Sequence, residues 1–156
     1  MYRRILVPLD GSSLSEQALE HVKEILPVPS STKIVLLRVV DPLATTYAGG
    51  TDAAIEVAVQ IQKKAEAEAA AYLKKVEGEL GEVGIPVKTV LTVGIPADVI
   101  LDYARQNRVD LIIMSTHGRS GISRWFFGSV AEKIIRHSQV PVLISPPRGS
   151  RSAGKG

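Results

Sequence analysis

The chain has no cysteine, which excludes disulfide bonds, thiolate nucleophiles and cysteine-bound metal centres. Aromatic residues make up only 4% of its 156 residues, so few side chains could stack on nucleic-acid bases. The net charge of +3 is too small to indicate a nucleic-acid partner. No apolar run approaches the roughly 20 residues that cross a bilayer, so we expect no membrane association.

Several familiar site patterns are also missing. There is no G-x-x-x-x-G-K-[ST] loop, and no G-x-G-x-x-G follows the first expected strand. A Ser-His-Asp hydrolase is disfavoured, because no G-x-S-x-G elbow occurs and Ser115 and His117 are too close in sequence to form a relay. The histidines His21, His117 and His137 lack carboxylate partners at ligand spacing, so no metal site is predicted.

The composition that remains is that of one globular domain, with 45% hydrophobic and 22% charged residues. The N-terminus passes directly into strand-like residues without a secretory signal pattern, which predicts a cytoplasmic protein. We expect a single domain over residues 1–146. Residues 147–156, which include Arg148, Arg151 and Lys155, are expected to form a flexible basic tail.

Short β-branched runs alternate with helical patterns along this domain. Strands are predicted at residues 5–7, 33–40, 87–93, 109–114 and 140–144, and helices from residue 13, over 52–80, from 96, and over 129–137. Two capping boxes, Ser13 with Glu16 and Ser129 with Glu132, are predicted to begin the first and last helices. The long second helix is predicted to pack on the sheet through Ile55, Val59, Ala65, Ala69, Tyr72, Val76 and Leu80.

This alternation predicts an α/β fold in three layers, a doubly wound parallel sheet with helices on both faces. Ligands of such sheets bind beyond the carboxyl ends of the strands, where the winding reverses. The segments to search are therefore residues 10–12, 39–41 and 115–128, which follow the first, second and fourth strands.

The segment after the fourth strand has the composition of a phosphate-binding loop. Gly118 and Gly121 permit close backbone approach, and Gly128 stands directly before Ser129, where a helix begins. The first turn of that helix offers unpaired N–H groups to an anion. These glycines could equally shape a tight loop and a cap. Asp10 likewise has two interpretations: its carboxylate could bind a sugar hydroxyl, or it could cap its own loop.

Two other α/β folds fit less well. A phospho-receiver domain needs an aspartate at the end of the third strand, where residues 91–93 read Leu-Thr-Val, and an acidic pair near Asp10, which stands alone. A flavodoxin needs aromatic loops to hold its flavin, and aromatic residues are scarce here.

Three motifs together resemble one family. The chain reads Ile-Leu-Val-Pro-Leu-Asp-Gly-Ser at 5–12, Arg-Val-Val-Asp at 38–41, and Met-Ser-Thr-His-Gly at 114–118, and nine residues then precede Gly-Ser-Val at 128–130. Over residues 3–146 this arrangement closely resembles the universal stress protein family, in its single-domain, ATP-binding type. The family pattern is Gly-x2-Gly-x9-Gly-(Ser/Thr).

The resemblance implies a Rossmann-like, five-stranded parallel sheet in the order 3-2-1-4-5. It implies ATP as the bound cofactor, with Mg²⁺ carried on the phosphates. It also implies a homodimer in which the last strands of two subunits meet through Val142, Leu143 and Ile144. Such pairing would cover a sheet edge that is otherwise prone to aggregate.

The resemblance assigns roles to individual residues. Pro8 and Leu9 would line the adenosine pocket, Asp10 would bind the ribose, the backbone of Val39 would meet the adenine edge, and Gly118, Gly128, Ser129 and Val130 would hold the phosphates. Met114 and Ser115 belong to the same motif, and His117 and Arg119, between matched positions, could contact phosphates.

One position departs from the pattern, because Ser115 replaces its first glycine. A left-handed backbone at that position would cost about 1–2 kcal/mol, whereas an ordinary β conformation would cost nothing and leave the hydroxyl free to bond. We expect nucleotide binding to survive this change.

The function predicted on this basis is that of an ATP-binding stress-response or regulatory protein. An alternative is a nucleotide-free dimeric interaction module of the same fold, to which the aromatic residues Trp125, Phe126 and Phe127 could contribute if they do not simply pack under the loop. Slow ATP hydrolysis, with Arg119 or Arg124 facing the γ-phosphate, is a lesser alternative, because no water-orienting group is evident.

Overall fold

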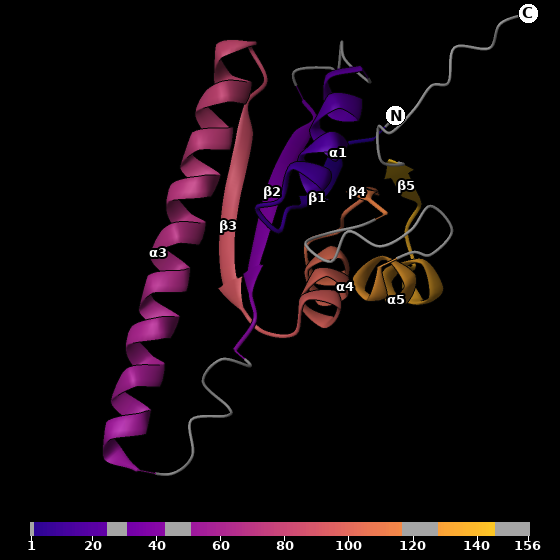
Figure 1. The fold of residues 1–156 in the computed structure, drawn as a ribbon. Helices are drawn as coiled ribbons and strands as arrows, with labels where there is room; N and C mark the ends of the chain where they lie inside the picture. The colour runs from indigo at the N-terminus through magenta and orange to yellow at the C-terminus, as the bar shows by residue number, and fades with distance from the viewer. Residues whose placement is uncertain (1, 25–30, 43–50, 117–127, 146–156) are drawn as a thin grey trace, which may run out of the picture.

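The fold is a parallel sheet of five strands in the order β3-β2-β1-β4-β5, with helices on both faces (Figure 1). The computed structural model describes residues 2–24, 31–42, 51–116 and 128–145. Its elements are β1 (Arg4–Pro8), α1 (Ser13–Glu24), β2 (Lys33–Val40), α3 (Asp52–Glu82), β3 (Val87–Val93), α4 (Pro96–Gln106), β4 (Leu111–Ser115), α5 (Ser129–His137) and β5 (Val142–Ser145). The predicted fold class and strand order are confirmed.

Two apolar layers hold the helices to the sheet. Successive side chains of a strand point to opposite faces, so Ile5 and Val7 of β1 pack with α1 and α3, while Leu6 packs with α4 and α5. All three side chains are almost completely buried, as expected for a central parallel strand. The two layers therefore cover both faces of this central strand.

The fourth and fifth strands begin two residues later than predicted. The Asp110 carboxylate accepts the backbone N–H groups of Arg3 and Arg4, at 2.6 and 2.7 Å, and the Val109 N–H donates to the Ala104 carbonyl at 3.0 Å. Residue 109 is therefore hydrogen-bonded to the end of α4 and residue 110 to the start of β1, and β4 begins only after them. The apolar pattern of residues 109–114 does not indicate these hydrogen bonds.

Both predicted capping boxes are wrong in their details. In α1 the capping hydroxyl belongs to Ser12, which accepts the Ser15 N–H at 3.1 Å. In α5 the capping position is Gly128, and no side chain of the described residues bonds the first turn of that helix. A helix start without a side-chain cap leaves backbone donors available.

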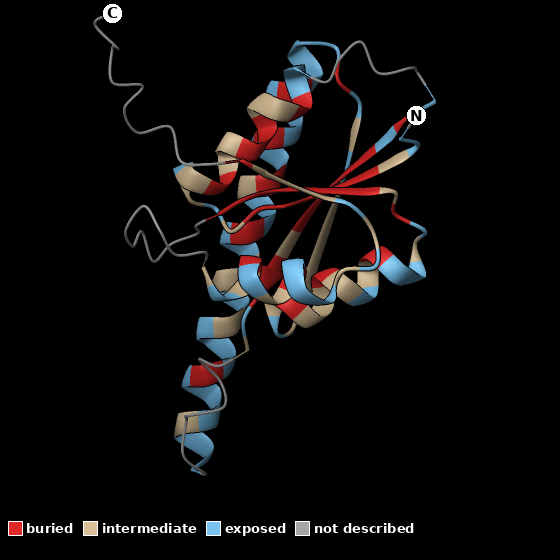
Figure 2. Ribbon diagram, turned by 90° about the vertical axis from the view of Figure 1, so that its right-hand side faces the viewer, coloured by how far each residue is buried: buried red, intermediate tan, exposed pale blue. Residues whose placement is uncertain are grey.

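The long helix α3 extends beyond the sheet. Its 31 residues span about 46 Å, whereas the eight residues of β2 span about 26 Å. The first half of α3 therefore projects past the carboxyl ends of the strands and is largely exposed (Figure 2). Ile55 and Val59, predicted to pack on the sheet, are 51% and 42% exposed. No helix within the described ranges is long and apolar enough to span a bilayer.

Gly94, between β3 and α4, provides a test of the packing. Its φ is +157°, and an added Cβ would lie 2.6 Å from Cγ2 of Val99. Gly94→Ala is therefore expected to lower the free energy of unfolding by about 1–3 kcal/mol, measured by urea denaturation. Gly78, inside α3, is the matched control, because nothing lies within 4 Å of the position that an added methyl group would take and alanine favours helices by up to about 1 kcal/mol. Equal effects of the two substitutions would contradict this account.

Candidate functional site

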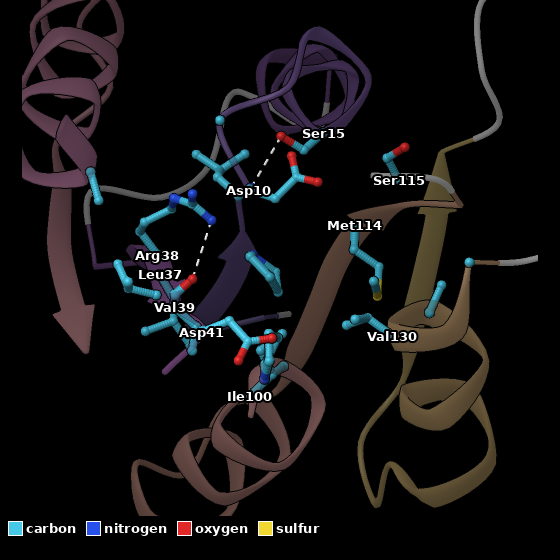
Figure 3. Close-up of a pocket in the computed structure, with 18 of the residues that line it drawn as sticks. Asp10, Ser15, Leu37, Arg38, Val39, Asp41, Ile100, Met114, Ser115 and Val130 are labelled. Carbon is cyan, nitrogen blue, oxygen red and sulfur yellow. Dashed lines mark hydrogen bonds between the residues drawn. The ribbon is translucent and has the colours of Figure 1, made fainter. Parts of the chain in front are cut away.

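A cavity of about 650 Å³ opens at the carboxyl ends of the strands, beside β1 and β4 (Figure 3). Its volume lies within the roughly 300–1,000 Å³ typical of small-molecule sites. Among its lining residues are nine predicted from the sequence: Pro8, Leu9, Asp10, Val39, Met114, Ser115, Gly128, Ser129 and Val130. The other three, His117, Gly118 and Arg119, lie outside the described residues. The cavity occupies the winding reversal where a ligand was expected.

The loop after β1 holds Asp10 at the cavity. One carboxylate oxygen of Asp10 accepts the N–H and the hydroxyl of Ser12, at 2.9 and 2.6 Å. The Ser15 hydroxyl receives the Asp10 N–H at 3.3 Å and donates to the Ser12 carbonyl at 2.9 Å. Gly11 makes the turn possible with a φ of +83°. The loop-capping interpretation of Asp10 is therefore confirmed, and its carboxylate still lines the cavity.

The end of β2 brings a cation to the cavity. The Arg38 guanidinium donates to the carbonyl of Val39 at 3.2 Å, as the dashed line in Figure 3 shows. Arg38 is the only lysine or arginine among the described lining residues, which also include the carboxylates of Asp41 and Glu68. This end of the cavity thus offers both hydrogen-bond donors and acceptors.

The start of α5 forms the opposite end of the cavity. The Gly128 N–H donates to the Thr116 carbonyl at 2.8 Å, which fixes the start of α5 next to the end of β4. Within the described part of the chain, nothing accepts from the N–H groups of Ser129, Val130 and Ala131. These donors and the helix dipole favour an anion, by about 0.3–1 kcal/mol at an exposed site.

Ser115 introduces no backbone strain at this end. It is the last residue of β4, it is paired with Ser145 of β5, and it is buried. An extended backbone suits any residue with a Cβ, so replacing the pattern's first glycine carries no penalty here.

Helices α3 and α4 contribute wall residues that sequence reasoning missed. From α3 come Ala65, Glu68, Ala69 and Tyr72, and from α4 come Pro96 and Ile100. The sequence pattern predicts only that Ala65, Ala69 and Tyr72 pack on the sheet. Their spacing in the sequence does show that they share a helix face. That this face borders a cavity depends on how far α3 extends past the strands.

Tyr72 of α3 has a buried side-chain hydroxyl. Burial raises the pKa of its hydroxyl above the usual range, and the neighbouring Glu16 carboxylate raises it further. The group is therefore protonated near neutral pH and can act as a hydrogen-bond donor.

The model of the family "Universal stress protein family" matches residues 1–146 of this chain. The chain belongs to the universal stress protein family. Universal stress protein MJ0577 of Methanocaldococcus jannaschii is 33% identical over 160 residues, covering 96% of this chain and 98% of that protein. Universal stress protein MJ0531 of the same organism is 34% identical and covers 92% of this chain and 82% of its own length.

Solved structures of universal stress proteins share the fold. That of MJ0577 superimposes with a TM-score of 0.85, covering 96% of this chain and 99% of the other. A universal stress protein in complex with cAMP is 23% identical with a TM-score of 0.66, covering 93% and 97% of the two chains. A family protein from Arabidopsis thaliana with AMP bound is 18% identical with a TM-score of 0.67, covering 97% and 96%.

Proposed function

We propose that this universal stress protein binds ATP in the cavity and acts as a nucleotide-dependent regulatory protein in the stress response. The observation that carries the proposal is the uncapped start of α5 at one end of a cavity of nucleotide size. Relatives of the same fold hold AMP and cAMP. Hydrolysis is not assigned, since its candidates Arg119 and Arg124 lie outside the described residues.

The proposed pose runs from β2 to α5. The triphosphate lies at the N–H groups of α5 and the Ser129 hydroxyl, with Mg²⁺ carried on its oxygens. The ribose lies beside Asp10, and Pro8 and Leu9 line the adenosine pocket. Because β2, the loop after β1 and the start of α5 all line this one cavity, an extended ligand can contact all three.

The adenine contacts the backbone of Val39. A carbonyl oxygen has two lone pairs, and in the free protein the guanidinium of Arg38 uses one of them at 3.2 Å. The adenine amino group either takes the other or displaces Arg38. The contacts to the base therefore depend on a side chain that can move, whereas the contacts to the phosphates come mainly from backbone N–H groups.

We extend the proposal to a homodimer joined through β5. This strand ends the sheet, and Val142, Leu143 and Ile144 remain partly exposed. An exposed edge pairs readily with another strand, and a twofold partner would cover it. The same edge supports the alternative function, a dimeric interaction module that holds no nucleotide.

Nucleotide binding is testable with the purified chain. We expect mass spectrometry of the denatured protein to detect carried-over ATP or ADP. In a thermal-shift titration, ATP at 100 times its dissociation constant should stabilise the fold by about 2.7 kcal/mol, which is roughly 5–10 °C for a domain of this size. Inorganic triphosphate at the same concentration is the control for a general anion effect. If neither assay detects nucleotide, the interaction module is favoured instead.

A further inference from the structure

The first half of α3, which projects past the strands, carries an exposed apolar surface (Figure 2). The described part of the chain has nine large hydrophobic side chains that are exposed, and four of them lie close together on this helix: Ile55, Val57, Val59 and Ile61. Single apolar side chains on a surface are ordinary, whereas a group of them on one element indicates an interaction surface.

The four side chains form two rows, one on each side of the buried Ala58. Ile55 and Val59 are four residues apart, so they lie one above the other along the helix. Val57 and Ile61 form the second row in the same way. A helix or sheet that covers one row therefore leaves the other exposed.

Charged side chains distinguish the first row from the second. Lys63 continues the first row one turn beyond Val59, and Glu56 lies beside it. Neither Glu56 nor Lys63 forms an ion pair or a side-chain hydrogen bond within the described residues. The lysine next to the second row, Lys64, already has a carboxylate on its own helix, that of Glu68 at 4.0 Å.

These charges make the first row complementary to a second copy of itself. In an antiparallel pair of helices with a twofold axis beside Val59, each Val59 packs on the other, and Ile55 packs on the methylene stem of the second copy's Lys63. The ammonium group of that lysine then reaches Glu56, and the twofold axis repeats the ion pair. A parallel pair would place like charges against each other.

We propose that the first half of α3 pairs with the same segment of a second copy of this chain, in antiparallel orientation, through Ile55 and Val59. The pairing does not depend on nucleotide binding. Helix α3 packs beside β3, at the sheet edge opposite β5, so this contact can form together with the proposed pairing of β5 strands and extend association beyond a dimer (Figure 1). Because the segment is short, the association should depend on protein concentration.

Charge reversal tests the pairing, with self-association of the full chain measured by sedimentation over a wide range of concentrations. Glu56→Lys and Lys63→Glu each turn both ion pairs of the twofold contact into repulsive pairs, and each should weaken association about 10-fold. The double variant Glu56→Lys/Lys63→Glu should restore the parent association constant, because its charges attract again. Added salt should reduce these differences.

Val59→Gln and Val57→Gln are the matched pair of variants, since both valines are exposed on the same helix but lie in different rows. Val59→Gln should weaken association by at least about 10-fold, because the twofold axis buries this side chain twice, and Val57→Gln should leave it unchanged. Glutamine is at least as favourable as valine in a helix, so neither variant should be less stable to urea than the parent protein.

The outcomes separate this contact from the proposed β5 dimer. If the parent protein associates but Glu56→Lys, Lys63→Glu and Val59→Gln leave the association constant unchanged, the inference is overturned and the β5 dimer stands. If the single reversals weaken association and the double variant does not restore it, the antiparallel pairing is wrong. A parent protein that remains monomeric at every concentration overturns both contacts without affecting the proposal that it binds ATP.

Discussion

Replacing Ser129 by aspartate is expected to weaken ATP binding by at least about 100-fold without destabilising the fold. Ser129 is the first residue of α5, is exposed, and lines the cavity where the phosphates are proposed to lie. A carboxylate about 4 Å from a phosphate charge is repelled by roughly 4 kcal/mol at an effective dielectric constant of 20, and solvent exposure reduces this toward the 2.7 kcal/mol of a 100-fold loss. The same carboxylate favours the helix, because it faces the positive end of the dipole.

The controls separate charge from shape. Ser129→Asn has nearly the size of the aspartate without its charge, and it should retain most of the ATP affinity. Adenosine, which has no phosphates, should bind Ser129→Asp as it binds the parent protein. Calorimetry gives the affinities, and urea denaturation should give an unfolding free energy equal to the parent value or up to about 1 kcal/mol higher. Unchanged ATP affinity in Ser129→Asp would place the phosphates away from α5.

The layered fold was predictable because its main cause is local. Strands such as residues 33–40 and 87–93 are short, β-branched and bounded by turn residues, and their observed limits agree with prediction. A parallel sheet follows from the helices between them. The order of the strands came from the family resemblance and not from these patterns.

The start of the fourth strand and the packing of the first half of α3 were predicted wrongly because both depend on distant parts of the chain. Asp110 ends a turn instead of joining the fourth strand, because its carboxylate bonds the backbone of Arg3 and Arg4 across more than 100 residues of sequence. Ile55 and Val59 follow the helical period that predicts a packed face, yet the strands they would cover end too soon. Neither a distant carboxylate nor the length of a sheet is visible in a helical or strand pattern.

The part of the candidate site that was predictable consists of residues in short sequence motifs at the ends of strands. Asp10, Val39 and Ser115 follow or end the first, second and fourth strands, and parallel topology brings such positions to one edge. The contribution of the α3 and α4 wall residues, such as Glu68 and Ile100, was not predictable, because it depends on how these helices pack beside the strand ends. Only the packed structure shows which helix faces border the cavity.

Ile134→Ala is expected to give the largest loss of stability, about 2–5 kcal/mol. Ile134 is fully buried in the layer beneath α5, against the side of the sheet that carries Leu6 and Ile112. Helix α5 has only nine residues, so it depends on this contact more than a longer helix would. Because Ala131 of the same helix lines the cavity, a loosened α5 should also lower the affinity for ATP.

The neighbouring Ile135 provides the control, since it is the same residue type in the same helix but 42% exposed. Ile135→Ala should change the unfolding free energy by less than about 1 kcal/mol, because alanine's helix propensity offsets the small loss of burial. For a domain of this length each kcal/mol corresponds to about 2–4 °C, so calorimetric melting temperatures should separate the two variants clearly. Equal melting temperatures would mean that α5 is not anchored through Ile134. The start of α5 would then be held instead by the hydrogen bond from the Gly128 N–H to Thr116 and by the Lys133–Asp98 ion pair.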